Sequence, residues 1–218
     1  MGEIADERSM ISRIIATDQD VAEGAVWLAD TDPRFARILD QIGPLPSRRR
    51  PGGFENLLNA IIGQQVSIAS ASAIWARLQS AGLTKEDTVA LASDDDLRAC
   101  GLSRQKILYA KSLAERRINY GALETLPDAD VIAHLIEVKG IGRWTAEVYA
   151  MFSLGRADVF APGDLALQEA ARVLFDLDAR PSEKALRAIA LDWSPWQAVA
   201  ARALWAYYRV IKDREGIR

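Results

Sequence analysis

Val138-Lys139-Gly140-Ile141-Gly142-Arg143-Trp144-Thr145-Ala146, followed further on by Ala161-Pro162-Gly163-Asp164, are the stretches that decide the fold of this 218-residue chain. The sequence before the first stretch predicts a helix over residues 131–137, and the sequence after the turn predicts another over 143–154. Only the five residues 138–142 join them, which is too few for anything but a tight reversal. The chain therefore predicts a helix-hairpin-helix over about residues 128–154.

Two glycines give this turn its chemistry. Gly140 and Gly142 have no Cβ, so each can adopt positive φ and let another backbone approach closely. The second helix presents unpaired N–H groups at its start, and such an end favours a phosphate. Taken alone, a Gly-x-Gly turn is more often an ordinary connection between helices. The continuation of the chain changes that balance.

The second stretch places a carboxylate at the start of a helix. Residues 157–160 read as a short extended run, and the Pro-Gly turn then delivers Asp164 to a helix expected over 165–175. Taken alone, an Asp after Pro-Gly is usually just an N-cap. Asp164 can be an N-cap and have a functional role at the same time. The dipole and the N–H groups of the helix favour the charged form of the carboxylate.

This order of hairpin, Gly/Pro loop and Asp resembles the helix-hairpin-helix DNA glycosylase superfamily. Residues 138–146, Asp158-Val159-Phe160 and Trp193-Ser194-Pro195-Trp196 are most similar to its 3-methyladenine DNA glycosylase II (AlkA-like) branch. The resemblance runs from about Thr17 to Tyr208. It implies a monofunctional enzyme of base excision repair that flips out alkylated bases, of the 3-methyladenine or 7-methylguanine type, and hydrolyses their N-glycosidic bond to leave an abasic site.

The fold expected is all-α. N-caps are predicted at Asp18, Asp32, Ser67 and Ser182, and helices are predicted over residues 21–29, 33–41, 54–62, 68–80, 104–119 and 196–208. No segment shows convincing strand alternation, and Gly and Pro residues at positions 43–53 mark a linker between domains. By resemblance, residues 17–52 and 156–218 form one helical lobe and residues 53–155 form a central lobe, with the hairpin at their junction. Residues 1–16 are expected to be a polar N-terminal segment. We also expect no N-terminal β domain of the kind that some family members carry.

The resemblance assigns the chemistry to a few side chains. Asp164 would stabilise the positive charge that develops on the sugar as the base departs. Trp144 stands where strand-cutting relatives use a lysine nucleophile, which predicts base release without strand cleavage. Trp144 and Trp196 would line the base pocket, although buried core is the default role of a tryptophan. Val148 and Leu165 occupy positions where an aromatic residue can occur, so a wider pocket is expected.

DNA contacts are predicted in two places. Residues 63–67 interrupt two expected helices, and by resemblance Gln65 is the wedge that enters the duplex, although such residues are commonly no more than a turn. The predicted contacts are Gln64, Gln65, Val66, Ser67, Lys139, Gly140, Ile141, Gly142, Arg143 and Thr145. By resemblance the backbone carbonyls of Ile136, Val138 and Gly140 hold a structural Na⁺ or K⁺ ion.

Composition sets limits on the other classes of protein. Half of the residues are hydrophobic, but no stretch approaches 18 uncharged apolar residues, so we expect no membrane span. The single Cys100 excludes an internal disulfide and a four-thiolate iron–sulfur cluster, and the lone His134 cannot build a zinc site. We expect a cytoplasmic monomer that binds double-stranded DNA with alkylated bases and needs no cofactor for catalysis.

Charge is distributed unevenly along the chain. The net charge is −3, but residues 1–46 alone carry −5, whereas residues 98–117 carry +5. A basic helix can bind phosphate, or it can simply be a solvated face, and charge alone favours neither. Two other functions remain open from sequence: a strand-cutting glycosylase of the same superfamily, and a non-catalytic helix-hairpin-helix module that only binds DNA.

Overall fold

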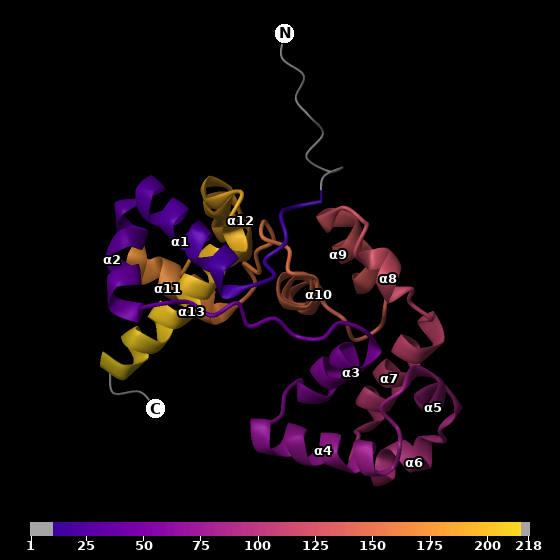
Figure 1. The fold of residues 1–218 in the computed structure, drawn as a ribbon. Helices are drawn as coiled ribbons and strands as arrows, with labels where there is room; N and C mark the ends of the chain where they lie inside the picture. The colour runs from indigo at the N-terminus through magenta and orange to yellow at the C-terminus, as the bar shows by residue number, and fades with distance from the viewer. Residues whose placement is uncertain (1–10, 215–218) are drawn as a thin grey trace. The chain divides into compact units, whose positions relative to one another are not determined.

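The computed structural model describes residues 11–214, and the chain forms two compact units. One unit comprises the residues up to Arg49 together with those from Ala150 onward, and the other comprises Arg50–Tyr149. The boundaries between the two lobes predicted from the sequence lie after residue 52 and after residue 155. Both units are helical (Figure 1), and within the described residues the only extended pairing is an isolated bridge between Ile14 and Arg156. The all-α prediction is confirmed for this part of the chain.

The first unit is built around the long C-terminal helix. It contains α1 (Asp18–Thr31), α2 (Pro33–Ile42), α11 (Leu165–Leu174), α12 (Glu183–Ala190) and α13 (Gln197–Arg214), with a 3₁₀ turn at Leu191–Trp193. Helix α13 packs against α11, α2 and α1 (Figure 1). Trp193 lies in this core, with its ring centroid 5.5 Å from that of Phe35, 5.3 Å from Phe160 and 5.9 Å from Phe175.

Two N-caps open this unit, and only one is where the sequence placed it. Asp32 caps α2 ahead of Pro33, as predicted. Helix α1 was expected to be capped by Asp18, but Thr17 caps it instead. The Thr17 hydroxyl accepts from the backbone N–H of Asp20 while the Asp20 carboxylate accepts from that of Thr17, a reciprocal box that Asp18 cannot complete.

The second unit contains eight helices among the described residues. They are α3 (Phe54–Gly63), α4 (Ile68–Ser80), α5 (Glu86–Leu91), α6 (Asp94–Ala99), α7 (Arg104–Arg116), α8 (Tyr120–Leu123), α9 (Asp128–Ile136) and α10 (Arg143–Tyr149). Helix α7 packs against α3, α5 and α6, and α9 packs against α10. The sequence missed the short α5 and α8. It also carried α7 on to residue 119, whereas Arg117 adopts a left-handed conformation that ends the helix.

The segment after α10 differs from the sequence-based expectation in two ways. The helix expected through residue 154 becomes a π-helix over Ala150–Leu154. The extended run expected at 157–160 is shorter, because residues 157 and 158 form a turn and the pairing to Ile14 comes from Arg156. In the part of the chain that the structure describes, no helix is long and apolar enough to cross a membrane.

Candidate active site and nucleic-acid interface

The hairpin turn joins α9 to α10 through a compact set of backbone hydrogen bonds. The N–H of Val138 donates to the Leu135 carbonyl at 3.2 Å, and the N–H of Ile141 donates to the Val138 carbonyl at 3.0 Å. Ile141 is buried and anchors the turn, whereas the side chains of Lys139 and Arg143 are exposed. The predicted tight reversal is confirmed, although α9 ends at Ile136, so six residues (137–142) join the helices where five were expected.

Only one of the two hairpin glycines needs its special conformation. Gly140 has φ of +91°, and a Cβ built there would lie 2.3 Å from the Tyr109 ring. Gly142 does not have a positive φ, and a Cβ there would meet nothing within 4 Å. The positive φ is therefore present at Gly140 and absent at Gly142, where the close approach of another backbone stays a prediction.

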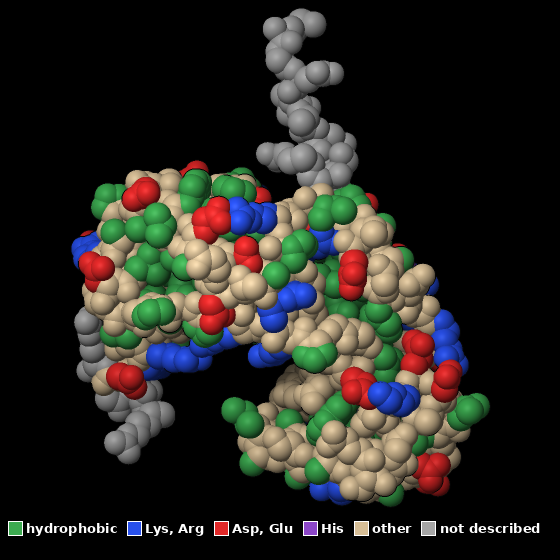
Figure 2. Space-filling model, in the orientation of Figure 1, with side chains coloured by type: hydrophobic (Ala, Val, Ile, Leu, Met, Phe, Trp, Pro, Cys, Tyr) green, Lys and Arg blue, Asp and Glu red, His purple; other side chains and the backbone are tan. Residues whose placement is uncertain are grey.

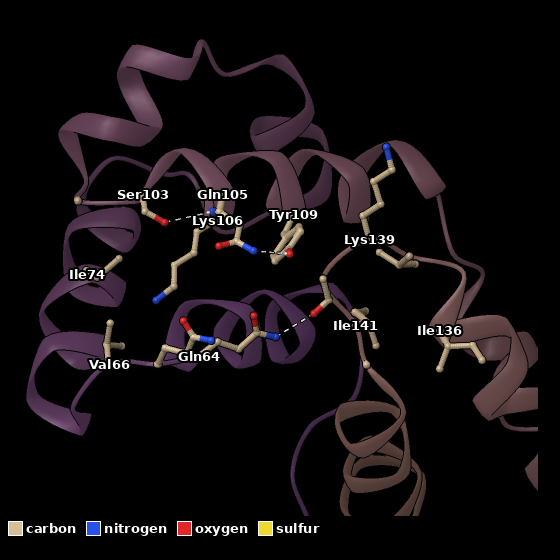
Figure 3. A pocket seen from close by; sticks show the side chains of 15 residues that line it. Gln64, Val66, Ile74, Ser103, Gln105, Lys106, Tyr109, Ile136, Lys139 and Ile141 are labelled. Carbon is tan, nitrogen blue, oxygen red and sulfur yellow. Dashed lines mark hydrogen bonds between the residues drawn. The ribbon is translucent and has the colours of Figure 1, made fainter. Parts of the chain in front are cut away.

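A cavity of about 680 Å³ lies in the second unit beside the hairpin. Its walls come from the loop after α3, from α7 and from residues 136–142 (Figure 3). Gln64, Gln105 and Lys106 give it polar groups. The sequence did not reveal this cavity, because its three walls are far apart along the chain.

The loop between α3 and α4 carries the predicted wedge. Gln65 is exposed and has a left-handed backbone with φ of +55°. Gln64 is partly buried, and its side-chain Nε2 donates to the Gly140 carbonyl at 2.8 Å. Ser67 caps α4 as predicted, accepting from the Ser70 N–H at 3.2 Å. Val66 is 38 % exposed, beside the almost fully exposed Ile68.

The other predicted DNA contacts are of two kinds. Ile141 and Thr145 are only 3 % and 8 % exposed, so a contact from either would have to use its backbone. Arg143 is exposed, and its Nε donates at 3.1 Å to Oε1 of Glu147, which is buried. These assignments stay predictions, as does the contact from Lys139.

Asp164 forms the N-cap of α11. Its Oδ1 accepts from the backbone N–H groups of Ala166 at 2.9 Å and Leu167 at 3.1 Å, and the side chain is half-buried. The preceding turn is held by Gln168, whose Nε2 donates to the Pro162 carbonyl at 2.8 Å. The carboxylate is thus held in a defined place at a helix N-terminus.

The two tryptophans predicted for the base pocket have different surroundings. Trp144, in the unit of residues 50–149, is 45 % exposed on α10. Trp196, in the same unit as Asp164, is 3 % exposed, and its ring packs closely on Gly24 beneath the Arg13 guanidinium, 4.7 Å from its centroid. Val148 is half-buried, and Leu165 is 63 % exposed. An exposed indole suits stacking on a base, whereas Trp196 contributes to the packing of its unit; the base-pocket role of all four residues stays a prediction.

Two of the carbonyls predicted to hold a monovalent cation already accept a hydrogen bond from the protein. The Val138 carbonyl accepts from Ile141, and the Gly140 carbonyl accepts from Gln64. A carbonyl oxygen has two lone pairs, so each retains one for a cation. A Na⁺ or K⁺ ion on the carbonyls of Ile136, Val138 and Gly140 stays a prediction.

The basic window of residues 98–117 is largely neutralised. Its ion pairs are Arg98 with Asp95, Lys111 with Asp94, Arg116 with Glu137, and Arg117 with Asp87 and Glu86. Acidic and basic side chains accordingly alternate over the region of α5 to α8 in Figure 2. Lys106 is 8 % exposed, its Nζ donates to the Ile62 carbonyl at 2.5 Å, and burial lowers its pKa. The structure therefore favours a solvated, paired helix face for this window.

Comparison with known proteins identifies the family. Residues 58–195 match the model of the HhH-GPD superfamily base excision DNA repair proteins. The chain is 31 % identical over 198 residues to DNA-3-methyladenine glycosylase 1 of Schizosaccharomyces pombe, covering 85 % of this chain and 86 % of that protein.

Two solved structures have the same fold. The crystal structure of DNA-3-methyladenine glycosidase from Bacillus halodurans superposes with a TM-score of 0.79 at 33 % identity, covering 92 % of this chain and 94 % of the other. The S. pombe 3-methyladenine DNA glycosylase Mag1 in complex with abasic DNA gives 0.72 at 29 % identity, covering 84 % and 95 %. With its hairpin, Pro-Gly turn and capping Asp164 in place, the chain belongs to the HhH-GPD superfamily of base excision DNA repair proteins.

Proposed function

We propose that this protein is a monofunctional DNA glycosylase that excises alkylated bases, of the 3-methyladenine or 7-methylguanine type, from double-stranded DNA. The observation that carries the proposal is the Asp164 carboxylate, held by two backbone N–H groups at the start of α11. Support comes from relatives named as 3-methyladenine glycosylases and from a structural neighbour bound to abasic DNA. The proposed enzyme acts as a cytoplasmic monomer without a catalytic cofactor.

In the proposed reaction the bond between C1′ of the sugar and the base nitrogen breaks, and its electron pair leaves with the base. Positive charge builds on the sugar, and the Asp164 anion stabilises it more in the transition state than in the ground state. Water then adds to C1′ and releases a proton, so the products are the free base and an abasic sugar with an intact strand.

Selection of alkylated bases is proposed to use the exposed indole of Trp144. Methylation of a ring nitrogen makes a purine electron-poor or cationic, and such a ring stacks well on an electron-rich face once it is flipped out of the duplex. In the strand-cutting relatives that the chain resembles, the lysine amine that forms a Schiff base stands at the position of Trp144. The reaction is therefore proposed to stop at the abasic site.

Phosphate binding is proposed for the backbone of the hairpin. Helix α10 begins at Arg143, a helix start is a place where backbone N–H groups can bind an anion, and a Cβ at the preceding Gly142 would meet nothing within 4 Å. A Na⁺ or K⁺ ion on the carbonyls of Ile136, Val138 and Gly140 would add positive charge facing the same phosphate. Contacts of this kind do not depend on base sequence, which suits a search for lesions.

Base release from a duplex with a single 3-methyladenine or 7-methylguanine tests the proposal. We expect Asp164→Asn to lower the single-turnover rate by at least about 100-fold, the usual loss for one electrostatic contributor to a transition state. Equal rates for the variant and the wild type would remove Asp164 from the mechanism. Borohydride trapping of a covalent adduct would favour a strand-cutting enzyme, and tight lesion binding without base release would favour a non-catalytic module.

A further inference from the structure

One side chain connects the wedge loop to the hairpin. Gln64 lies 76 residues before Gly140 in sequence, yet its Nε2 donates to the Gly140 carbonyl at 2.8 Å. Figure 3 shows this bond crossing from the end of α3 to the hairpin turn. The amide of Gln64 is directed at the protein backbone, whereas Gln65 is exposed.

Helix α7 supports both ends of this bond. On the side of the loop, the Lys106 ammonium donates to the Ile62 carbonyl in the last turn of α3, two residues before Gln64. On the side of the hairpin, the Tyr109 ring lies against Gly140, close enough to exclude any Cβ there. The loop and the hairpin are therefore each held on one rigid helix and joined to each other by Gln64.

We infer that Gln64 is a positioning residue that fixes Gln65 with respect to the phosphate-binding hairpin, and that it does not itself contact DNA. This inference rests on the proposed function. Gln65 has a left-handed backbone, which a non-glycine residue adopts only where its neighbours enforce it. With the adjacent Gln64 bonded to Gly140, the loop holds Gln65 outward before DNA arrives, so less ordering is needed on binding.

The way the effects of two mutations combine distinguishes a positioning role for Gln64 from a direct contact with DNA. A side chain that reads or fills the duplex acts independently of Gln65, so the two losses multiply on mutation. A side chain that acts only by holding Gln65 in place has no further effect once Gln65 is truncated, because residues that act as a unit are not additive. The double-mutant cycle therefore separates the two roles.

The experiment measures affinity for a duplex with a tetrahydrofuran abasic-site analogue, for wild type, Gln64→Met, Gln65→Ala and the double variant. We expect about a tenfold loss for each single variant and no further loss for the double variant. Multiplied losses, or no loss in Gln64→Met or in Gln65→Ala, would overturn the inference. Gln105→Met is the matched control, because that amide faces the same cavity but donates to the Tyr109 hydroxyl, and we expect less than a twofold change.

A second readout needs neither DNA nor catalysis. Amide hydrogen exchange of residues 138–142 should be faster in Gln64→Met than in wild type and unchanged in Gln105→Met. Equal exchange in all three proteins would overturn the positioning role of Gln64. Gln64→Glu, which keeps the size but cannot donate to the Gly140 carbonyl, replaces Gln64→Met if that variant does not fold. If the wild type releases no base but hydrogen exchange is faster in Gln64→Met, the proposed function is contradicted and the hydrogen bond from Gln64 still holds the hairpin.

Discussion

The ring of Tyr109 lies directly against Gly140, so that a Cβ at this position would come within 2.3 Å of the ring. Tyr109 comes from α7, and Gly140 comes from the hairpin between α9 and α10. This contact explains why the hairpin takes glycine here for two reasons at once: positive φ and a close approach.

Gly140→Ala should therefore destabilise the protein strongly. We expect a loss of about 2–4 kcal/mol in the free energy of unfolding, from backbone strain and from displacement of the Tyr109 ring. Gly142→Ala is the matched control, with no positive φ and open space at the Cβ, and should change stability by less than about 0.5 kcal/mol. Urea unfolding of both variants checks this, and similar losses would refute it.

The two roles of Asp164 can be separated by the choice of substitution. Asn at an N-cap accepts the same backbone hydrogen bonds, so Asp164→Asn should stay within a few tenths of a kcal/mol of wild type. Asp164→Ala removes the cap from Ala166 and Leu167 and should lose about 1 kcal/mol. Both variants should lose base release to a similar degree, as measured by single-turnover rates. A stable but fully active Asp164→Asn would leave the cap as the only role.

The two tryptophans should respond differently to truncation. Trp144→Ala, at an exposed position, should lower base release by about 10- to 100-fold, as expected for one base–aromatic stack, with little change in stability. Trp196→Ala, in the packed unit beneath Arg13, should lose about 3–5 kcal/mol of unfolding free energy. Thermal unfolding and rates measured together check the contrast; a destabilised Trp144→Ala with unchanged turnover would reverse the assignment.

Salt dependence of DNA binding distinguishes exposed from paired cations. Lys139→Ala, at the exposed hairpin, should reduce the slope of log K against log salt by about 1, the effect of one lost phosphate contact. Lys111→Ala, whose ammonium pairs with Asp94 at 2.7 Å, should leave the slope unchanged. Binding titrations on undamaged duplex over a range of salt concentrations check both, and a larger effect at Lys111 would restore the basic window as a DNA-binding face.

Acid should remove the contribution of Asp20 to stability. Backbone N–H and hydroxyl groups of Thr17, with the N–H of Ala16, lower the Asp20 pKa from its ordinary value of 3.8. A lowered folded pKa means that the contribution is present above pH 3.8 and is lost as pH falls through the lowered pKa. Wild type should therefore be more stable than Asp20→Asn near pH 7, and the difference should shrink below pH 3.8. A difference that persists at pH 2 would contradict this charge-based account.

Local chemistry was enough to predict much of this protein. Pro33 after Asp32, Ser67 and Ser182 before apolar runs, and the Pro-Gly turn before Asp164 each marked a helix start, because capping depends on residues within one turn. The hairpin was readable for the same reason, since five residues between two helices leave few paths. The family followed from these signals in their order.

Pairing over long sequence separations was decided only by the tertiary structure. The sequence showed five excess positive charges in residues 98–117, but not that Arg116 would meet Glu137 or that Arg117 would meet Asp87. It predicted both Gln64 and Gln65 as DNA contacts and did not show that Gln64 would bond to Gly140. It also treated Gly140 and Gly142 alike, and the Tyr109 ring of α7 makes them different. A hydrogen bond or a ring contact depends on which groups folding brings within a few ångströms, and no local pattern encodes that.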